Sequence, residues 1–257
     1  MDKNYHSFDD QPCLETNTCL GAKLLRLAPI NNRQEALLAR LEENVTSVPA
    51  GTLLLNEGEP VRDLIILNEG WVSCRKQLPD GRMSISQILH PGDIVGFENL
   101  AFKQVKNNCL AESNLKVCRF PREHLNDVFS ESPRISALMM ALGAIEQAII
   151  SDRVMISRRN DGEARLALFL LQTLARLRLM NDQIYDQFHC PLRQQQIGDA
   201  TGLTSVHVSR TLGRLEDRGL LARRGQFIRI LDEKKLAELV DFNDRYQQLD
   251  FSWLPED

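Results

Sequence analysis

The sequence predicts an α+β protein in which a β-rich domain, a long helix and a winged helix-turn-helix follow one another along 257 residues. Three observations carry this prediction. Short β-rich runs alternate with turn residues between Thr46 and Phe120. Residues 133–159 have the heptad spacing of a long helix, and residues 192–218 form two short helices around a glycine-containing turn.

Composition restricts the classes of protein to which this chain can belong. A net charge of −4 gives no global signal for nucleic acid, so any such surface must be local. No run approaches the roughly 18 apolar residues of a membrane span, and the N-terminus lacks a signal pattern, so we expect a cytoplasmic protein without a membrane partner. Six cysteines without a secretion signal indicate reduced thiols, metal ligands or redox-sensitive groups instead of a disulfide framework.

The N-terminal half of the chain predicts an arm followed by a β domain. The first residues are polar and lack periodicity, so we expect an extended arm over residues 1–24. Residues 31–44 have helical spacing, and short strands then alternate with turns such as NEGEP, PDG and HPGD. Glycines stand where tight turns need them. We therefore expect residues 25–132 to form a jelly-roll-like barrel or sandwich.

A helix over residues 133–159 is the element around which the chain is organised. Its aliphatic residues recur at spacings of three and four, the pattern of a helix that lies along another helix. Asp152 interrupts this seam, and two such carboxylates meeting across a symmetric dimer would repel each other. The alternative is a core helix of one domain, with Asp152 turned to solvent or paired. The predicted dimer seam comprises Ile135, Leu138, Leu142, Ile145, Ile149, Asp152 and Ile156.

The residues after this helix predict a compact helical domain with a short β tail. An Asn-Asp-Gly triplet breaks the long helix, and Asp161 is a suitable N-cap for a second helix over residues 163–180. Two shorter helices then meet at Thr201–Gly202–Leu203, which is the helix-turn-helix pattern. We assign residues 160–235 to this domain and residues 236–257 to a C-terminal tail.

The second of these short helices has two chemically distinct faces. Val208, Leu212 and Leu215 share the face that we expect to be buried. The opposite face carries small residues and Arg210, which suits the major groove, where an arginine reads guanine through O6 and N7. Other polar residues near the helix N-terminus are placed to hold phosphates. The predicted DNA-binding residues are Arg193, Thr204, Ser205, Val206, His207, Ser209, Arg210 and Arg214.

A basic hairpin follows the two helices. Residues 220–230 have the pattern of a β-hairpin wing, with Arg223 and Arg224 at its turn. Helix and wing together supply a local basic patch that the net charge conceals. The alternative is a helical hairpin used for protein contacts, which the adjacent basic wing disfavours.

The chain resembles the CRP/FNR family of bacterial transcription regulators over roughly residues 25–232. The most specific parts are PGDIVGF at residues 91–97, the long helix, and GLTSVHVSRTLGRLE at residues 202–216. The resemblance implies a cyclic-nucleotide-binding-like β-roll and a homodimer on a palindromic operator, with half-sites about one helical turn apart. It also implies RNA polymerase as a partner, while the choice between activator and repressor stays open.

One branch of the family binds cyclic nucleotides in the β-roll. Its members hold the ligand phosphate with an Arg-Ser or Arg-Thr pair, and no arginine stands between Phe102 and Lys116 here. Lys103 or Lys106 could substitute only as a point charge, without the bidentate clamp. The resemblance therefore does not favour a cyclic nucleotide as effector.

The oxygen-sensing branch holds a [4Fe–4S] cluster with N-terminal cysteines and one cysteine late in the β domain. The resemblance assigns Cys13, Cys19 and Cys118 to these positions, with Asp10 where a further cysteine is expected. A carboxylate is a harder ligand than a thiolate and would make the cluster more labile. The alternative is a disordered arm with Cys118 as a small core residue.

Two further residues bear on this branch. Asp152 matches an acidic residue of its dimer helix, which is thought to keep the cluster-free protein monomeric. Val206 stands where oxygen-sensing members usually carry glutamate, whereas Ser209 and Arg210 match. Valine cannot accept a hydrogen bond from cytosine but can touch a thymine methyl, so the operator should differ at that position.

The sequence thus predicts a homodimeric DNA-binding transcription regulator that senses oxygen, redox state or nitric oxide through an N-terminal Fe–S cluster. The alternative is a regulator of the same family that answers a small molecule or thiol oxidation without a cluster. Cys74 and Cys109 lie in predicted strands, where we expect them to be packing residues, and they remain candidates for a thiol switch with Cys13 or Cys19. No paired catalytic carboxylates, nucleophile motif or Gly-rich phosphate loop supports an enzyme.

Overall fold

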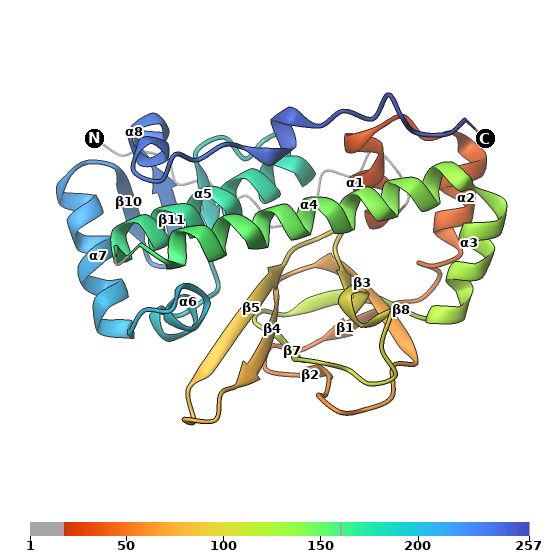
Figure 1. Cartoon of the computed structure of the whole chain (residues 1–257), viewed down its shortest axis with the longest axis horizontal. Helices are drawn as coiled ribbons and strands as arrows, with labels where there is room; N and C mark the ends of the chain where they lie inside the picture. The colour runs from red at the N-terminus through yellow and green to blue at the C-terminus, as the bar shows by residue number, and fades with distance from the viewer. Residues whose placement is uncertain (1–17, 160, 257) are drawn as a thin grey trace.

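The computed structural model describes residues 18–159 and 161–256, which form a β-roll, a layer of helices and a C-terminal domain. The helix α4 (Pro133–Ser157) runs across the whole molecule, with the β-roll beneath it and α5 (Gly162–Met180) behind it (Figure 1). The C-terminal tail returns along α4 toward the N-terminal helices. The long helix predicted over residues 133–159 is thus present.

The β-roll consists of two four-stranded antiparallel sheets with the orders β1-β8-β3-β6 and β2-β7-β4-β5. The inward-facing aliphatic residues of both sheets form a shared core, as the alternating pattern predicts. Gly70 is needed at its turn, because a Cβ there would lie 2.5 Å from the Asn114 carbonyl oxygen. The strands are β1 (Val45–Val48), β2 (Leu53–Leu55), β3 (Asp63–Glu69), β4 (Val72–Gln77), β5 (Met83–Leu89), β6 (Ile94–Val95), β7 (Asn108–Ala111) and β8 (Leu115–Pro121).

Three short helices cover the end of the roll: α1 (Cys19–Leu27), α2 (Asn32–Ala39) and α3 (Leu125–Glu131). The extended arm expected over residues 1–24 is corrected from Cys19 onward, whereas residues 1–17 lie outside the described residues. Thr18 caps α1, and every residue from Cys19 to Leu24 is buried. Its nine residues are fewer than the roughly 11–18 over which a helical repeat can be recognised, which explains why periodicity did not predict it.

The C-terminal domain is built on α5, which Asp161 caps through the backbone N–H groups of Glu163 and Ala164, as predicted. Its core also includes Trp71, Ile85 and Ile88 of the β-roll, so the two domains share packed surface. The remaining elements are β9 (Gln187–His189), α6 (Gln194–Thr201), α7 (Ser205–Asp217), β10 (Leu221–Arg224), β11 (Phe227–Ile230) and α8 (Glu233–Glu238), with the sheet order β10-β11-β9.

The predicted dimer seam of α4 is corrected by the packing within the chain. Ile135, Leu138, Ile145, Ile149 and Ile156 are buried, and Leu142 is half-buried. Ile135, Leu138 and Leu142 pack in a core with the N-terminal helices, and Ile156 packs in the core of the C-terminal domain. This face is therefore not free to meet a second copy. The heptad spacing instead reflects packing within the chain, which is the alternative interpretation of this helix as a core helix.

Asp152 is also not the unpaired seam acid that the sequence suggested. Its carboxylate accepts two hydrogen bonds from Arg245, from Nε at 3.0 Å and from Nη2 at 2.7 Å. Arg245 belongs to the tail, whose Leu254 is buried among the N-terminal helices. The tail thus links the C-terminal domain, α4 and the sensor end of the molecule.

Candidate nucleic-acid interface and sensor sites

The helix-turn-helix depends on two glycines. Gly202 ends α6 with φ of 70°, and the Leu203 N–H donates to the Gly198 carbonyl at 3.0 Å. A Cβ on Gly198 would lie 2.4 Å from the Leu203 carbonyl oxygen, so only glycine allows this close crossing. Thr204 then caps α7 by accepting from the His207 N–H at 3.2 Å, as the sequence predicts.

The two faces of α7 are separated as the sequence predicts. Val208, Leu212 and Leu215 are buried in the domain core. The opposite face opens to solvent, and Val206, in the first turn of the helix, is 57% exposed. A shallow groove on this face is lined by Thr204, Val206, His207, Arg210, Gly213, Arg214 and Asp217.

Arg210 is exposed and has neither a hydrogen-bond nor an ion-pair partner within residues 18–159 and 161–256. Its guanidinium is therefore available to a base edge without breaking another contact. Arg214 donates to the Thr211 hydroxyl at 3.1 Å, which turns it along the helix. Ser209 is exposed beside Arg210, and Ser205 is half-buried in the first turn.

Two predicted phosphate contacts have different settings. Arg193 is exposed where α6 begins. The His207 ring lies against the start of α5, since a Cβ on Gly162 would meet its Nε2 at 2.7 Å. His207 therefore stands between two helix N-termini, where an anion is favoured.

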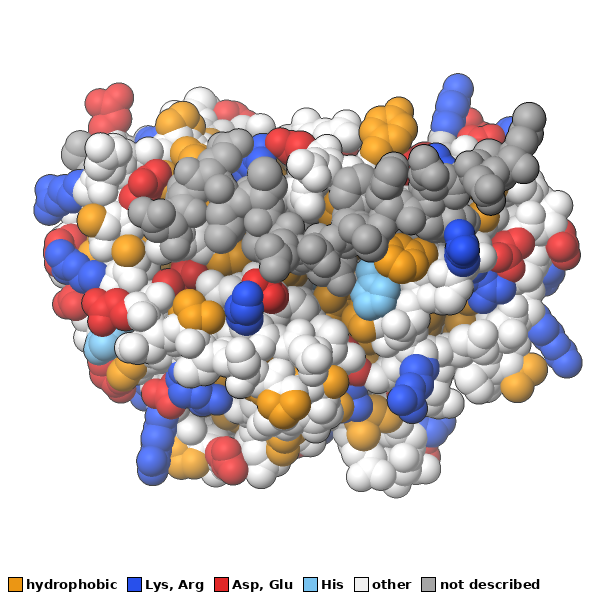
Figure 2. All heavy atoms as spheres, turned by 180° about the vertical axis from the view of Figure 1, so that it is seen from behind, with side chains coloured by type: hydrophobic (Ala, Val, Ile, Leu, Met, Phe, Trp, Pro, Cys, Tyr) orange, Lys and Arg blue, Asp and Glu red, His pale blue; other side chains and the backbone are white. Residues whose placement is uncertain are grey.

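The wing is present as the hairpin β10–β11, but one of its arginines is engaged. Arg223 is half-buried and pairs with Glu216 at 2.5 Å, so it adds less to the predicted basic patch than an unpaired arginine would. Arg224 adjoins the turn at Gly225. On the rear face, basic and acidic side chains are interspersed over the part drawn in colour (Figure 2). Five of the predicted DNA contacts, Thr204, Val206, His207, Arg210 and Arg214, line the groove on the α7 face.

Cys19 and Cys118, two of the residues predicted to hold a cluster, both contact Glu42. The Glu42 carboxylate accepts from the Cys19 and Leu20 N–H groups, each at 2.9 Å, and the Cys118 thiol donates to the Glu42 carbonyl at 3.5 Å. Burial, reinforced by Glu42, raises the pKa of Cys118 to about 11 and that of Cys19 well above its usual range. Both thiols therefore need a nearby cation to ionise, as thiolate ligands of iron do. Cys13 and Asp10 lie outside the described residues.

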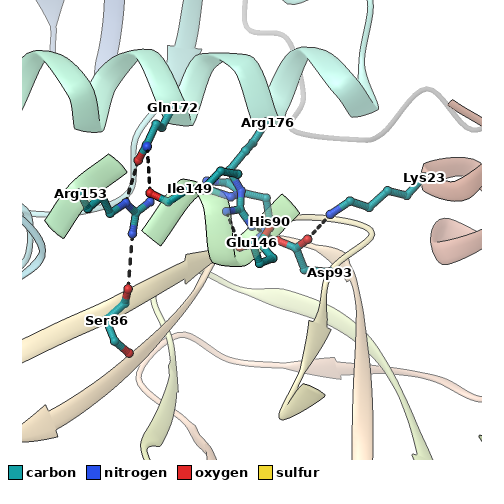
Figure 3. Close-up of polar contacts among 9 residues, drawn as sticks. All are labelled: Lys23, Ser86, His90, Asp93, Glu146, Ile149, Arg153, Gln172 and Arg176. Carbon is teal, nitrogen blue, oxygen red and sulfur yellow. Dashed lines mark hydrogen bonds and ion pairs between the residues drawn. The ribbon is translucent and has the colours of Figure 1, made fainter. Parts of the chain in front are cut away.

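A buried charge cluster joins α1 and the β-roll to α4 and α5 (Figure 3). Asp93, in the turn before β6, pairs with Lys23 of α1 and with Arg176 of α5, the latter at 2.9 Å. Arg176 also pairs with Glu146 of α4 at 2.9 Å. Burial would raise the pKa of Asp93, but Lys23 and Arg176 hold it well below its usual range. Sequence reasoning missed this cluster, although Lys23 and Arg176 are charges within otherwise apolar helical stretches.

His90 lies at the edge of the same cluster. Its ring meets Trp71 edge-on at a centroid distance of 4.4 Å, and its two ring nitrogens have no hydrogen-bond partner among the described residues. Burial and the nearby Arg176 charge lower its pKa well below the usual range, so the ring is neutral. Arg153 and Gln172 extend the contacts between α4 and α5, with Nε to Oε1 at 2.7 Å.

A β-roll joined by one long helix to a winged helix-turn-helix with an exposed recognition face defines a DNA-binding transcription regulator. Two family models match the chain, a cyclic nucleotide-binding domain over residues 45–132 and a Crp-like helix-turn-helix domain over residues 164–239. The chain belongs to the CRP/FNR family of transcription regulators, whose members are not enzymes.

Curated relatives and solved structures agree with this assignment. The chain is 26% identical to the Anaerobic regulatory protein of Pasteurella multocida (89% of this chain, 81% of the relative). It is also 26% identical to the Fumarate and nitrate reduction regulatory protein of Escherichia coli K12 (90% and 89%). FixK2 of Bradyrhizobium japonicum matches with a TM-score of 0.67 and 25% identity (76% and 96%). A CRP-family regulator of Thermus thermophilus has the same fold, with a TM-score of 0.60 and 22% identity (78% and 99%).

Proposed function

We propose that this regulator is a cytoplasmic homodimer that binds a palindromic operator, contacts RNA polymerase and responds to oxygen or redox state through an Fe–S cluster. The observation that carries the DNA-binding role is the exposed, unpaired Arg210 on the open face of α7. Each subunit would place this face in one major groove. Relatives named for anaerobic and for fumarate and nitrate regulation support the choice of effector.

The donor set supports a cluster held by Cys13, Cys19 and Cys118, with Asp10 as a further ligand. A bound cluster would supply oxygen-sensitive iron chemistry. Cys19 is the first residue of α1, and Lys23 lies one turn further on the same helix. Lys23 pairs with Asp93, and Asp93 pairs with Arg176 of the C-terminal domain. A shift of α1 would therefore reach the DNA-binding domain through paired charges.

Iron and sulfide analysis of protein purified without oxygen tests the effector. We expect iron and sulfide in near-equal amounts, and their loss in Cys118→Ser. Cys190→Ser is the matched control, because Cys190 is a buried thiol in the core of the C-terminal domain. Protein that contains no iron, yet binds its operator, would contradict the proposed effector and leave the DNA-binding role intact.

The uncovered face of α4 is the surface that we propose for dimerisation. Met140, Ile150, Val154 and Met155 are apolar and 37–65% exposed. Met140, Ala144, Gln147, Ser151 and Val154 repeat at spacings of four and three along this face, as in a helix pair. By length and composition α4 could also cross a membrane, but a third of its most apolar stretch is buried in the chain. A second copy on a palindromic site covers this face without a membrane.

Val154→Glu should therefore separate the subunits. Two unpaired carboxylates facing each other across the axis should raise the dimer dissociation constant by about a hundredfold or more. Sedimentation measures this change. Val45→Glu is the matched control, because Val45 is 56% exposed on β1, far along the chain from α4. A Val154→Glu protein that stays dimeric would exclude this face.

A cavity in the structure supports the second class of effector, a small molecule. A cavity of about 380 Å³ lies between the β-roll and α4, lined by apolar side chains such as Leu89, Phe97 and Met139 and by an equal number of polar or charged ones. Lys23 and Glu146 also line it. Such a cavity suits a small ligand that carries both apolar and polar groups. A colourless protein stabilised by a small molecule would favour this class over the cluster.

A further inference from the structure

Two cysteines face each other inside the β-roll, away from the sensor cysteines. Cys74 of β4 is paired in register with Cys109 of β7, and both side chains are 0% exposed. Their Sγ atoms lie 3.2 Å apart. The contact with the Cys109 thiol, reinforced by burial, raises the pKa of Cys74 well above its usual range.

A carboxylate completes the cluster. Glu98 lies in a 3-10 helix (Phe97–Asn99), and one of its oxygens and the two sulfur atoms all lie within 4.8 Å of one another. Among the described residues no lysine or arginine forms an ion pair with Glu98, and the Asn99 amide donates to it at a long 3.4 Å. Burial raises the pKa of Glu98 accordingly. Three acidic groups therefore converge here without a positive partner.

We propose that Cys74, Glu98 and Cys109 form a site for a divalent metal of zinc type. Two sulfurs and one carboxylate oxygen are ligands that zinc accepts, and the hard carboxylate argues against a purely thiophilic ion. A tetrahedral ion about 2.3 Å from each sulfur needs them roughly 3.7 Å apart, which small side-chain rotations provide. Binding releases one proton from each thiol to solvent, and a water completes the fourth position.

Glu98 would connect a bound ion both to the cavity through which it enters and to helix α4. Glu98 also lines the cavity between the roll and α4, so an ion can approach from that side. The neighbouring Phe97 ring lies beside α4, since a Cβ on Gly143 would meet it at 3.6 Å. A bound ion would fix residues 97–99 against the helix whose far face we assign to the dimer. The site shares no residue with the proposed cluster ligands.

Titration of the reduced, full-length protein with Co²⁺ under anaerobic conditions tests the site, because cobalt reports thiolate ligands by a charge-transfer band. We expect one equivalent of Co²⁺ with this band, its loss in Cys109→Ser, and displacement of cobalt by Zn²⁺. Glu98→Gln should keep the band and weaken affinity by about tenfold or more, in the range that supporting ligand changes produce. Cys190→Ser is the control and should bind as the unmodified protein does.

Other outcomes overturn the proposal. One is a band that survives Cys109→Ser but disappears in Cys118→Ser, which would place the metal at the sensor cysteines. Another is the finding that denatured, unreduced protein has two fewer free thiols than its cysteines predict. If reductant restores those two thiols and the deficit does not occur in Cys109→Ser, the pair is a disulfide. If Cys109→Ser does not fold by circular dichroism, the Glu98→Gln titration decides, and unchanged affinity there also overturns the site.

Discussion

Asp93→Asn is expected to lower the free energy of unfolding by about 3–5 kcal/mol, the cost of leaving buried charges without their partner. The carboxylate pairs with Lys23 and Arg176, and all three side chains are at most 7% exposed. Asparagine keeps the shape but cannot neutralise two cations, and Glu146 is left as the remaining partner of Arg176. Urea denaturation followed by circular dichroism measures the change.

The depressed pKa of Asp93 predicts how the stability difference between the two proteins changes with pH. Lys23 and Arg176 depress the pKa of Asp93, so its stabilising contribution is fully present above the ordinary aspartate pKa of about 3.9 and declines as the pH falls below that value. The difference between the two proteins should therefore be constant near neutrality and shrink in acid. Asp80→Asn, at an exposed hairpin, is the matched control. Equal stability of Asp93→Asn and the unmodified protein would show that the cluster is not formed.

Arg210→Ala is expected to abolish discrimination at one guanine of each half-site. A bidentate arginine–guanine pair contributes about 1–3 kcal/mol, which corresponds to roughly 5- to 150-fold per half-site. Because Arg210 has no other partner in the described chain, its removal should leave the fold intact. Operator selection followed by fluorescence anisotropy at fixed salt measures both the affinity and the loss of preference.

Arg218→Ala separates base reading from general charge. Arg218 is also an exposed arginine of this domain, but it pairs with Glu163 and lies outside the groove on α7. It should change affinity little and leave the base preference unaltered. Arg210→Lys should lose much of the preference, because lysine lacks the planar fork. An Arg210→Ala protein that selects the same guanine would assign base reading to another residue.

The sequence predicted the elements whose signals are local. The strand pattern, the Asp161 and Thr204 caps and the buried face of α7 all appear where residue spacing places them. A strand repeats every two residues and a helix every 3.6, so neighbouring residues suffice to predict these features. The same reasoning identified the open face of α7 that carries Arg210.

The contacts around helix α1 and within the β-roll could not be predicted from residue spacing. No short-range signal joins Lys23, Asp93, Glu146 and Arg176, which come from four separate segments of the chain. Cys74 and Cys109 were expected in strands, but their pairing with each other depends on strand order. Helix α1 was missed because its nine residues are too few to show a clear helical repeat.

The sequence by itself determined the class of protein: a β-roll, a long helix and a winged helix-turn-helix with a distinct recognition face. Only the tertiary structure decided which side of α4 is buried. That helix carries apolar residues on both sides, among them Ile145 inside and Val154 outside, so heptads can be drawn along either. The same packing pairs Asp152 with Arg245. The spacing of apolar residues predicts that a helix will be covered. The shape of the surrounding chain decides which elements cover it.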